Sequence, residues 1–365
     1  MTPYKFLLAA LFTTACGTTS DGGPDGGTFN QNPDGGPLAE CDHSDLTMTV
    51  TTLAGCNEKG MVDGARAVVR FSNPVNVAIA PSTVTYVADF DNNRLRAVES
   101  NGATSTIVQG MQFARPFGLA FAPNGTTLYV QTDDNPDAQH TDETGTVWRV
   151  DVNTGMTAVV ARDIGRPRGI AVLSDGKIAL ADYVHHVVSI LDPGTGAVTL
   201  LAGTRNAAGH ANGTGAAAKF AQPYDVVEIP GGDLVVSDMD NHRLRRVTRA
   251  GVVSDYAGTG AVGGDDGPVA TSTFALPQGL AIDSGMIYVS DVQNRTIRRV
   301  MGGEVTTIAG DGMPGFQDSN APLTARFFGL EGIDVRAGRL VAADGNIGND
   351  AEPYNRVRVI DLQKL

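Results

Sequence analysis

The sequence predicts an all-β fold in which one small antiparallel unit is repeated around a common centre. The 365 residues include 45 glycines and only 18% charged residues, a composition that favours short strands and tight turns. No long amphipathic helical pattern interrupts the candidate strands. In addition, one sequence motif, the recurring phrase described below, is repeated along nearly the whole chain, which is the pattern expected of a repeat protein.

The recurring phrase starts with an apolar stretch that ends in Leu-Ala-Gly, followed by a glycine-rich loop and Phe-x-x-Pro. An apolar strand, Tyr-Val-x-Asp, Asn-x-Arg and a further apolar strand complete it. The first, fourth and fifth copies are nearly complete, whereas the other three are degenerate. The six copies begin at Phe71, Phe113, Arg166, Phe220, Phe274 and Phe327.

Each copy holds four candidate strands of the usual length, about five or six residues. The alternation at Val77-Ala78-Ile79 indicates a strand with one covered face. A single four-stranded sheet cannot bury both of its faces, but six sheets packed radially can. We therefore predict a six-bladed β-propeller of four-stranded antiparallel blades over residues 44–365.

The two ends of this region predict how the ring closes. Residues 46–55 have the pattern of the last strand of a unit, and residues 357–360 have the pattern of a third strand. We expect the N-terminal strand to complete the sixth blade, because that pairing removes an open sheet edge.

The first sixteen residues have the features of an export signal, with a positive start at Lys5 and an apolar run too short to span a bilayer. The small residues before Cys16 resemble the lipobox of bacterial lipoproteins, although Thr13 stands where Leu is usual. The resemblance implies a signal peptide over residues 1–16, with Cys16 acylated as the new N-terminus. The alternatives are an ordinary secretory signal cut nearby and a cysteine placed there by chance.

Residues 17–43 contain repeated Asp-Gly-Gly segments and little that a core could bury, so we expect a flexible tether. Gly17, rather than an aspartate, follows Cys16, which favours the outer membrane of a two-membrane cell. The lipid anchor is the only membrane contact that we expect.

Two further cysteines, Cys41 and Cys56, lie on either side of a probable strand. An exported protein meets an oxidising compartment, so a disulfide between them is allowed. A strand of that length could also hold them too far apart for a bond. The sequence leaves open a disulfide and a pair of buried free thiols.

The repeats resemble the NHL-repeat family in their Leu-Ala-Gly, Pro-x-Gly-hydrophobic-Ala, Tyr-Val-Ala-Asp and Asn-x-Arg-Ile segments, over about residues 47–360. The resemblance implies a six-bladed propeller. It does not imply one activity, because relatives include protein-binding and RNA-binding modules, sensor domains and some enzymes. A formal net charge of −13 argues against a nucleic-acid partner, whose phosphates favour a basic face.

A candidate binding site lies at the position directly after the repeat proline, which varies while its neighbours repeat. In such a blade this position is the head of the innermost strand, where the central channel meets the face that carries the long loops. Side chains there could grip a polar organic group or a peptide tip; the alternative is a position near solvent that drifts. The residues of this channel-mouth ring are Phe117, Arg168, Tyr224, Gln278 and Glu331, with Val75 in the first copy.

The next position is Gly in four copies but Asn76 and Asp225 in the other two. Together with Glu331, these residues could offer oxygen ligands to Ca²⁺. Lactonase-type six-bladed propellers hold a channel metal with similar ligand types. We expect no other cofactor.

The aspartate that ends each second strand is expected to cap the following turn rather than to act in catalysis, because Asp side chains accept backbone N–H bonds in turns. The arginine of Asn-x-Arg is expected to lie nearby. Residues 133–137 are acidic but lack the spacing of a calcium loop, so we expect a solvated turn. The turn-capping residues are Asp89, Asp182, Asp238, Asp291 and Asp344.

Catalytic patterns are missing from the sequence. None of the six histidines stands at the head of an inner strand, as the zinc ligands of amidating-lyase relatives require, and we find no nucleophile elbow. We therefore expect a monomeric, membrane-tethered binding or scaffold module for a protein, peptide or saccharide of the cell envelope. The alternative is a metal-dependent lactonase-type hydrolase, or a lyase, that uses the central channel.

Overall fold

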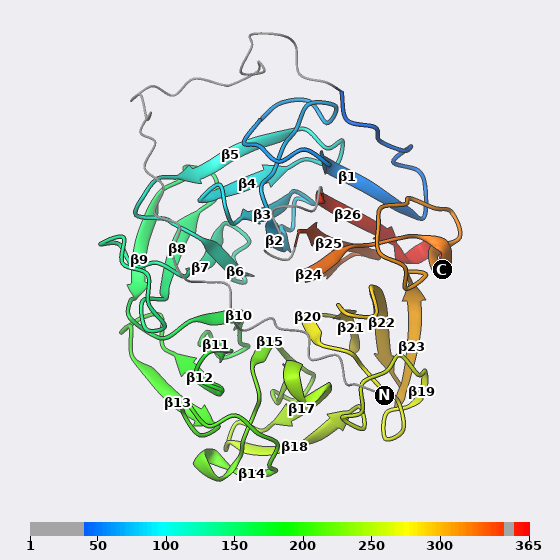
Figure 1. Cartoon of the computed structure of the whole chain (residues 1–365). Coiled ribbons are helices and arrows are strands. Elements are labelled where there is room, and N and C mark those ends of the chain that lie inside the picture. The colour runs from blue at the N-terminus through cyan, green and yellow to red at the C-terminus, as the bar shows by residue number, and fades with distance from the viewer. Residues whose placement is uncertain (1–39, 347–353) are drawn as a thin grey trace, which may run out of the picture.

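The computed structural model describes residues 40–346 and 354–365. Cys16, the predicted signal peptide and residues 17–39 of the predicted tether lie outside the described residues. The described chain forms six antiparallel sheets around a central axis (Figure 1). The predicted six-bladed propeller is confirmed.

Blades one to three follow each other along the chain, and each runs from its innermost to its outermost strand. Their strands are β2 (Pro74–Ile79), β3 (Thr85–Asp89), β4 (Arg94–Val98) and β5 (Thr104–Gln109); β6 (Pro116–Phe121), β7 (Thr127–Thr132), β8 (Thr146–Asp151) and β9 (Thr157–Ala161); β10 (Pro167–Val172), β11 (Ile178–Asp182), β12 (Val187–Leu191) and β13 (Val198–Ala202).

Blades four and five each add a two-residue strand at the outer edge, and blade six combines the two ends of the chain. Their strands are β15 (Pro223–Glu228), β16 (Leu234–Asp238), β17 (Arg243–Val247), β18 (Val252–Ala257) and β14 (Gly213–Thr214); β20 (Pro277–Asp283), β21 (Met286–Asp291), β22 (Thr296–Met301), β23 (Glu304–Ala309) and β19 (Gly267–Pro268); β24 (Gly329–Arg336), β25 (Arg339–Gly345), β26 (Asn355–Asp361) and β1 (Val50–Cys56).

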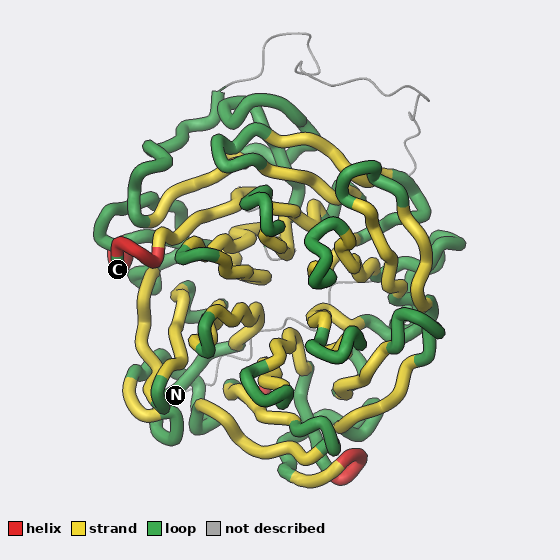
Figure 2. The backbone as a smooth tube through the Cα atoms, turned by 180° about the vertical axis from the view of Figure 1, so that it is seen from behind, coloured by secondary structure: helices red, strands yellow, loops and turns green. Residues whose placement is uncertain are grey.

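Within residues 40–346 and 354–365, helix is limited to short 3₁₀ turns, some of which Figure 2 shows in red at the margin of the ring. None of the helices in the described ranges has the length and apolar character needed to cross a membrane. The 3₁₀ turns are η1 (Gly215–Ala217), η2 (Met239–Asn241), η3 (Pro322–Thr324) and η4 (Leu362–Lys364).

The fifth strands of blades four and five depart from the predicted four strands per blade. Long glycine-rich crossovers reach back along the rim, so that β14 pairs with β18 and β19 pairs with β23. The crossovers before blades two and three are short, and nothing in the described chain pairs with the outer edges of β9 and β13. The long crossovers before blades one and six make only single bridges to the outermost strand, Gly64 with Thr104 and Ser319 with Val50, so a long crossover is needed for a fifth strand but does not ensure one.

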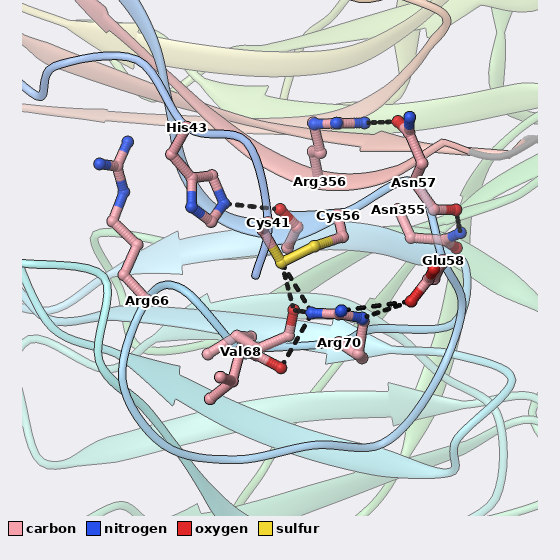
Figure 3. The surroundings of a disulfide bond; sticks show 12 residues. Cys41, His43, Cys56, Asn57, Glu58, Arg66, Val68, Arg70, Asn355 and Arg356 are labelled. Atoms are coloured by element: carbon pink, nitrogen blue, oxygen red, sulfur yellow. Dashed lines mark hydrogen bonds and ion pairs between the residues drawn. A yellow bond between two sulfur atoms is a disulfide. The ribbon is translucent and has the colours of Figure 1, made fainter. Parts of the chain in front are cut away.

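The ring closes as predicted. Strand β1 pairs with β26 from Val50 opposite Ile360 to Cys56 opposite Asn355, so the first and last strands share blade six. The segment before β1 folds back, and the structure joins Cys41 to Cys56 in a disulfide with 5.5 Å between their Cα atoms (Figure 3). The strand begins only at Val50, which leaves the preceding residues free to turn and removes the distance problem raised by the sequence.

A buried aspartate–arginine pair holds each well-preserved blade together. In blade five, Asp291 accepts the backbone N–H of Ala275 at 2.7 Å and pairs with Arg298 at 2.7 Å, and neither charged side chain is exposed. The arginine lies two residues beyond that of Asn-x-Arg, as Arg245 does beyond Arg243 in blade four. In blade five Thr296 occupies the Asn-x-Arg position, and the preceding Arg295 contacts the carbonyl of Gln293. The same pairs are Asp89–Arg96, Asp238–Arg245 and Asp344–Arg358.

The two least regular blades replace this pair. In blade two, Thr132 and Trp148 occupy the aspartate and arginine positions, and the indole N–H donates to the threonine oxygen at 2.8 Å. In blade three, Asp182 remains but pairs with the imidazole of His185 at 2.7 Å. Degenerate repeats thus keep a buried polar contact at the same place with different chemistry.

Each innermost strand has a register shift within its first residues, after the first residue in blades one to five and after the second in blade six. In blade two the shift falls between Pro116 and Leu119, and in blade six it falls between Leu330 and Ile333. Such bulges redirect side chains away from the regular alternation of a strand. The corresponding shifts in the other blades begin at Pro74, Pro167, Pro223 and Pro277.

Candidate functional site

The central channel is closed at the end that carries the long loops. The channel-mouth ring residues stand at the six register shifts, and their side chains meet near the axis. The rings of Phe117 from blade two and Tyr224 from blade four are 5.8 Å apart, and the guanidinium of Arg168 from blade three lies 4.0 Å from the Phe117 ring centre. Phe117 is only 3% exposed and Tyr224 only 8%. The structure therefore brings Phe117, Arg168 and Tyr224 together, and their side chains are largely buried.

A second layer of residues, which sequence reasoning missed, lies over this ring. It comes from the position after the repeat aspartate: Phe90 and Tyr183 stack around Arg168 at 5.4 and 4.9 Å, and Asp133 pairs with Arg168 at 3.1 Å. The signal that could have found the layer is variation between copies at this position, like that of the ring itself. Asp133 is completely buried, so its predicted place in a solvated turn is wrong.

Opposite charges stabilise each other in this layer. Burial opposes ionisation of Asp133, but Arg168 and Arg166 more than offset it, and the pKa of Asp133 lies below its usual value. Burial likewise opposes the charge of Arg168, but the Asp133 carboxylate outweighs it and raises the pKa of Arg168. In this half of the mouth two arginines share the Asp133 carboxylate, and aromatic rings surround Arg168.

The other half of the ring lacks such pairing. Glu331 is 9% exposed, and its carboxylate makes no hydrogen bond or ion pair with any residue of the described ranges. Burial, with a smaller contribution from Asp91, raises the pKa of Glu331 to about 8, although Arg168 acts to lower it. Gln278 donates to the sulfur of Met239 at 3.3 Å, but its buried carbonyl oxygen has no donor within the same ranges.

Below the ring, the innermost strands of all six blades enclose a cavity of about 220 Å³. Most of the lining side chains are apolar, with Asp225, Asp334 and Asn76 as the main polar side chains and Arg336 at the strand ends. Because the lining comes from the later residues of each strand, the cavity lies toward the face opposite the long loops.

The two cavity carboxylates bind backbone and join neighbouring blades. Asp225 accepts N–H bonds from Val226 and from Leu280 of blade five, both at 2.8 Å. Asp334 accepts from Val335 at 2.7 Å and from Ile79 of blade one at 2.6 Å. Burial raises the pKa of Asp225 to about 7 and that of Asp334 to about 6. Asp334 was missed in the sequence, although an acid at a position that is Ala or Val in the other copies could have marked it.

The three predicted calcium ligands, Asn76, Asp225 and Glu331, do not form a common site: two of them accept backbone N–H bonds. Asn76 accepts the N–H of Val77 at 2.8 Å, the Asp225 oxygens are engaged as above, and Glu331 belongs to the mouth. Across the residues that the structure describes, no three or more His, Cys, Asp or Glu side chains gather closely enough to hold a metal ion.

The loop face also presents apolar side chains. Four consecutive crossovers, those between blades four and five, five and six, six and one, and one and two, each expose at least one large apolar residue. These are Val262 (60% exposed), Met313 (56%) with Leu323 (54%), Met61 (45%) and Met111 (82%). Exposed methionines adapt their shape to a partner surface, and exposed apolar clusters often mark contact sites.

The repeats are similar in sequence to those of a known NHL repeat-containing protein. No protein-family model matches the chain. The chain is 32% identical over 119 residues, 30% of its length, to NHL repeat-containing protein 2 of Homo sapiens, of which the match covers 16%. It is 27% identical over 295 residues, 69% of its length, to Protein SUPPRESSOR OF QUENCHING 1, chloroplastic, of Arabidopsis thaliana, of which the match covers 27%. The chain thus spans about a quarter or less of these relatives.

Solved structures share the fold at low identity. One is a protein of unknown function from Bacteroides thetaiotaomicron, with a TM-score of 0.70 and 18% identity over 85% of this chain and 74% of that one. Auxiliary nutrient binding proteins from Bacteroides thetaiotaomicron and Bacteroides ovatus give TM-scores of 0.67 and 0.65 at 18% and 20% identity, each over 85% of this chain and 75% of theirs.

Proposed function

We propose that this NHL-repeat six-bladed β-propeller is a non-catalytic binding module that is exported, lipid-anchored in the cell envelope and holds a protein, peptide or saccharide on its loop face. The observation that carries the proposal is the run of exposed apolar residues on four consecutive crossovers around a closed channel mouth. Apolar tips favour a protein or peptide among these ligands. Two proteins of the same fold are auxiliary nutrient binding proteins, which is consistent with a binding role.

Site-directed photo-crosslinking tests which face binds. A photoreactive amino acid replaces Met313 or Met61 on the loop face, or Met156 as the matched control. Met156 is 72% exposed in the turn between β8 and β9, on the opposite face. We expect envelope proteins or peptides to crosslink at Met313 and Met61 only. Equal capture at Met156 would contradict a loop-face site.

The anchor is tested separately. A Cys16→Ser substitution should abolish incorporation of a radiolabelled fatty acid and release the propeller from the membrane fraction. Cys41→Ser is the matched control, because it removes a cysteine that the structure pairs with Cys56. Fatty-acid labelling that persists in Cys16→Ser would refute lipidation at this residue.

A second candidate function is a metal-dependent lactonase-type hydrolase or a lyase. The observation that favours it is the cavity of about 220 Å³ with Asp225, whose pKa of about 7 suits a general base near neutral pH. Elemental analysis of the purified protein, followed by calcium titration of metal-free protein, tests it. A stoichiometric metal that is lost in Asp225→Ala would favour the enzyme; no binding of calcium by the metal-free protein would remove it.

A further inference from the structure

We infer that the channel mouth binds a primary ammonium group, with the Glu331 carboxylate as its counter-charge and the Gln278 carbonyl as a second acceptor. This inference rests on the proposed binding function and names the chemistry at the centre of the loop face. Suitable ligands carry a lysine side chain, a free amino terminus or a small alkylamine.

Glu331 faces the axis of the propeller. Glu331 belongs to blade six, yet its charge acts to raise the pKa of Tyr224 in blade four. Arg168 of blade three acts to lower the pKa of Glu331. The strand heads of blades five and six touch at this level, because the Ser290 hydroxyl of blade five donates to the Glu331 carbonyl at 2.6 Å. Gln278 stands at the ring position of blade five, so its amide and the Glu331 carboxylate occupy neighbouring places around one mouth.

Among the described residues, the buried Glu331 Oε2 has no hydrogen-bond partner. Arg168, the nearby positive group, instead pairs at 3.1 Å with Asp133, a carboxylate that it shares with Arg166. A buried carboxylate without a partner is strongly disfavoured, and the buried Gln278 carbonyl oxygen also has no donor among the described residues. An ammonium group supplies one positive charge and three N–H donors, which matches a carboxylate and a carbonyl together.

The surroundings also select among small ligands. The aromatic rings of Tyr224 and Phe117 border the mouth and can attract a cation through their faces. An alcohol of the same size brings a single O–H donor and no charge, and a carboxylate would be repelled by Glu331. We expect the order of affinity to be ammonium, then alcohol, then carboxylate.

The test uses n-butylammonium, n-butanol and butyrate as matched probes, with NMR titration of the isotopically labelled propeller. We expect n-butylammonium to shift the signals of Glu331, including its carboxyl carbon, and of Gln278. Glu331→Gln keeps the shape but removes the charge, and should weaken n-butylammonium binding about tenfold or more. Glu304→Gln, at an exposed glutamate of β23, is the control and should bind like the wild type.

Peptides then separate the sources of the amine. One peptide has an acetylated amino terminus and one lysine; another has a free amino terminus and norleucine in place of lysine; a third has neither amine. We expect at least one amine-bearing peptide to shift the Glu331 carboxyl signal, and the third peptide not to do so. That carboxyl signal is read in the wild type, so the test stands even if Glu331→Gln fails to fold.

Three outcomes would overturn the inference. Equal affinity for n-butanol or butyrate at the ring would do so while leaving a binding function at the loop face intact. Equal n-butylammonium affinity in Glu331→Gln would show that the charge is not its partner. If none of the probes shifts the ring signals, the mouth is not an amine site. The crosslinking experiment at Met313 and Met61 then remains the test of binding at the loop face.

Discussion

Exchanging the polar pair of blade five for that of blade two tests whether these pairs are interchangeable units. Arg298 donates to Asp291 at 2.7 Å, to the carbonyls of Thr273 and Asp265 at 3.0 Å, and to Asp266 at 2.8 Å. Substituting Arg298→Trp alone leaves the fully buried Asp291 carboxylate without its cation. Removing one partner of a buried pair costs about 3–5 kcal/mol, so we expect the free energy of unfolding to fall by about 4 kcal/mol.

The reverse single change, Asp291→Thr, leaves the buried Arg298 without its carboxylate and should cost a similar amount. The double variant reproduces the Thr132–Trp148 contact of blade two, in which an indole donates to a hydroxyl at 2.8 Å. Blade two packs Trp148 against Phe113, and blade five packs Arg298 against Phe274, so the replaced side chain has the same aromatic neighbour. We expect the double variant to lose only about 2–3 kcal/mol, well short of the sum of the single losses.

Urea denaturation of the four proteins, followed by fluorescence and circular dichroism, measures the cycle. A double variant whose loss lies within about 1 kcal/mol of the sum of the single losses would refute the reasoning, because additivity means that the two positions do not act as a pair. Arg295→Trp is the matched control. Arg295 directly follows Asn294 in the same turn and contacts a carbonyl rather than Asp291.

Three further predictions concern covalent closure and titrating groups. Replacing Cys41 and Cys56 together by alanine should lower the free energy of unfolding by about 3 kcal/mol, because the disulfide spans a separation of 15 residues; hydrogen exchange that does not rise in β1 would contradict this. Burial raises the pKa of Glu331 from 4.5 to about 8, so its contribution to stability is complete below pH 4.5 and is lost as the pH rises to about 8. Wild type should therefore weaken relative to Glu331→Gln over that range by about 3–5 kcal/mol in denaturation series, and a difference independent of pH would refute it. His242 accepts the Leu276 N–H at 3.2 Å and must be neutral to do so, and burial lowers its pKa. Stability should thus fall as the pH drops below 6.5, and less steeply in His242→Asn; identical acid profiles would rule this out.

The architecture could be predicted because repetition is a global property of the sequence. Six copies of one phrase fix the number of blades, and the incomplete copies at the two ends fix the closure through β1 and β26. These conclusions need no knowledge of any single contact. The place of the channel-mouth ring followed in the same way, since one position in each copy must head the innermost strand.

What could not be predicted depends on segments that break the repeat. Arg168 was expected to be available to a ligand, but it is buried against Asp133, which lies in the irregular insertion of blade two. The Cys41–Cys56 bond was left open because the strand's starting residue decides the distance, and sequence patterns locate strand ends poorly. The arginine that pairs with each aspartate was also misplaced by two residues, because the register between β21 and β22 decides which side chain faces Asp291.

The disulfide would have a mechanical consequence under the proposed N-terminal anchoring. A pulling force that enters at residue 40 reaches Cys41 and passes through the sulfur atoms to Cys56, at the far end of β1. Residues 42–55 form a closed side loop that carries no load. The force therefore does not act on the Val50 end of β1, and pulling on the N-terminal segment does not separate β1 from β26 starting at Val50.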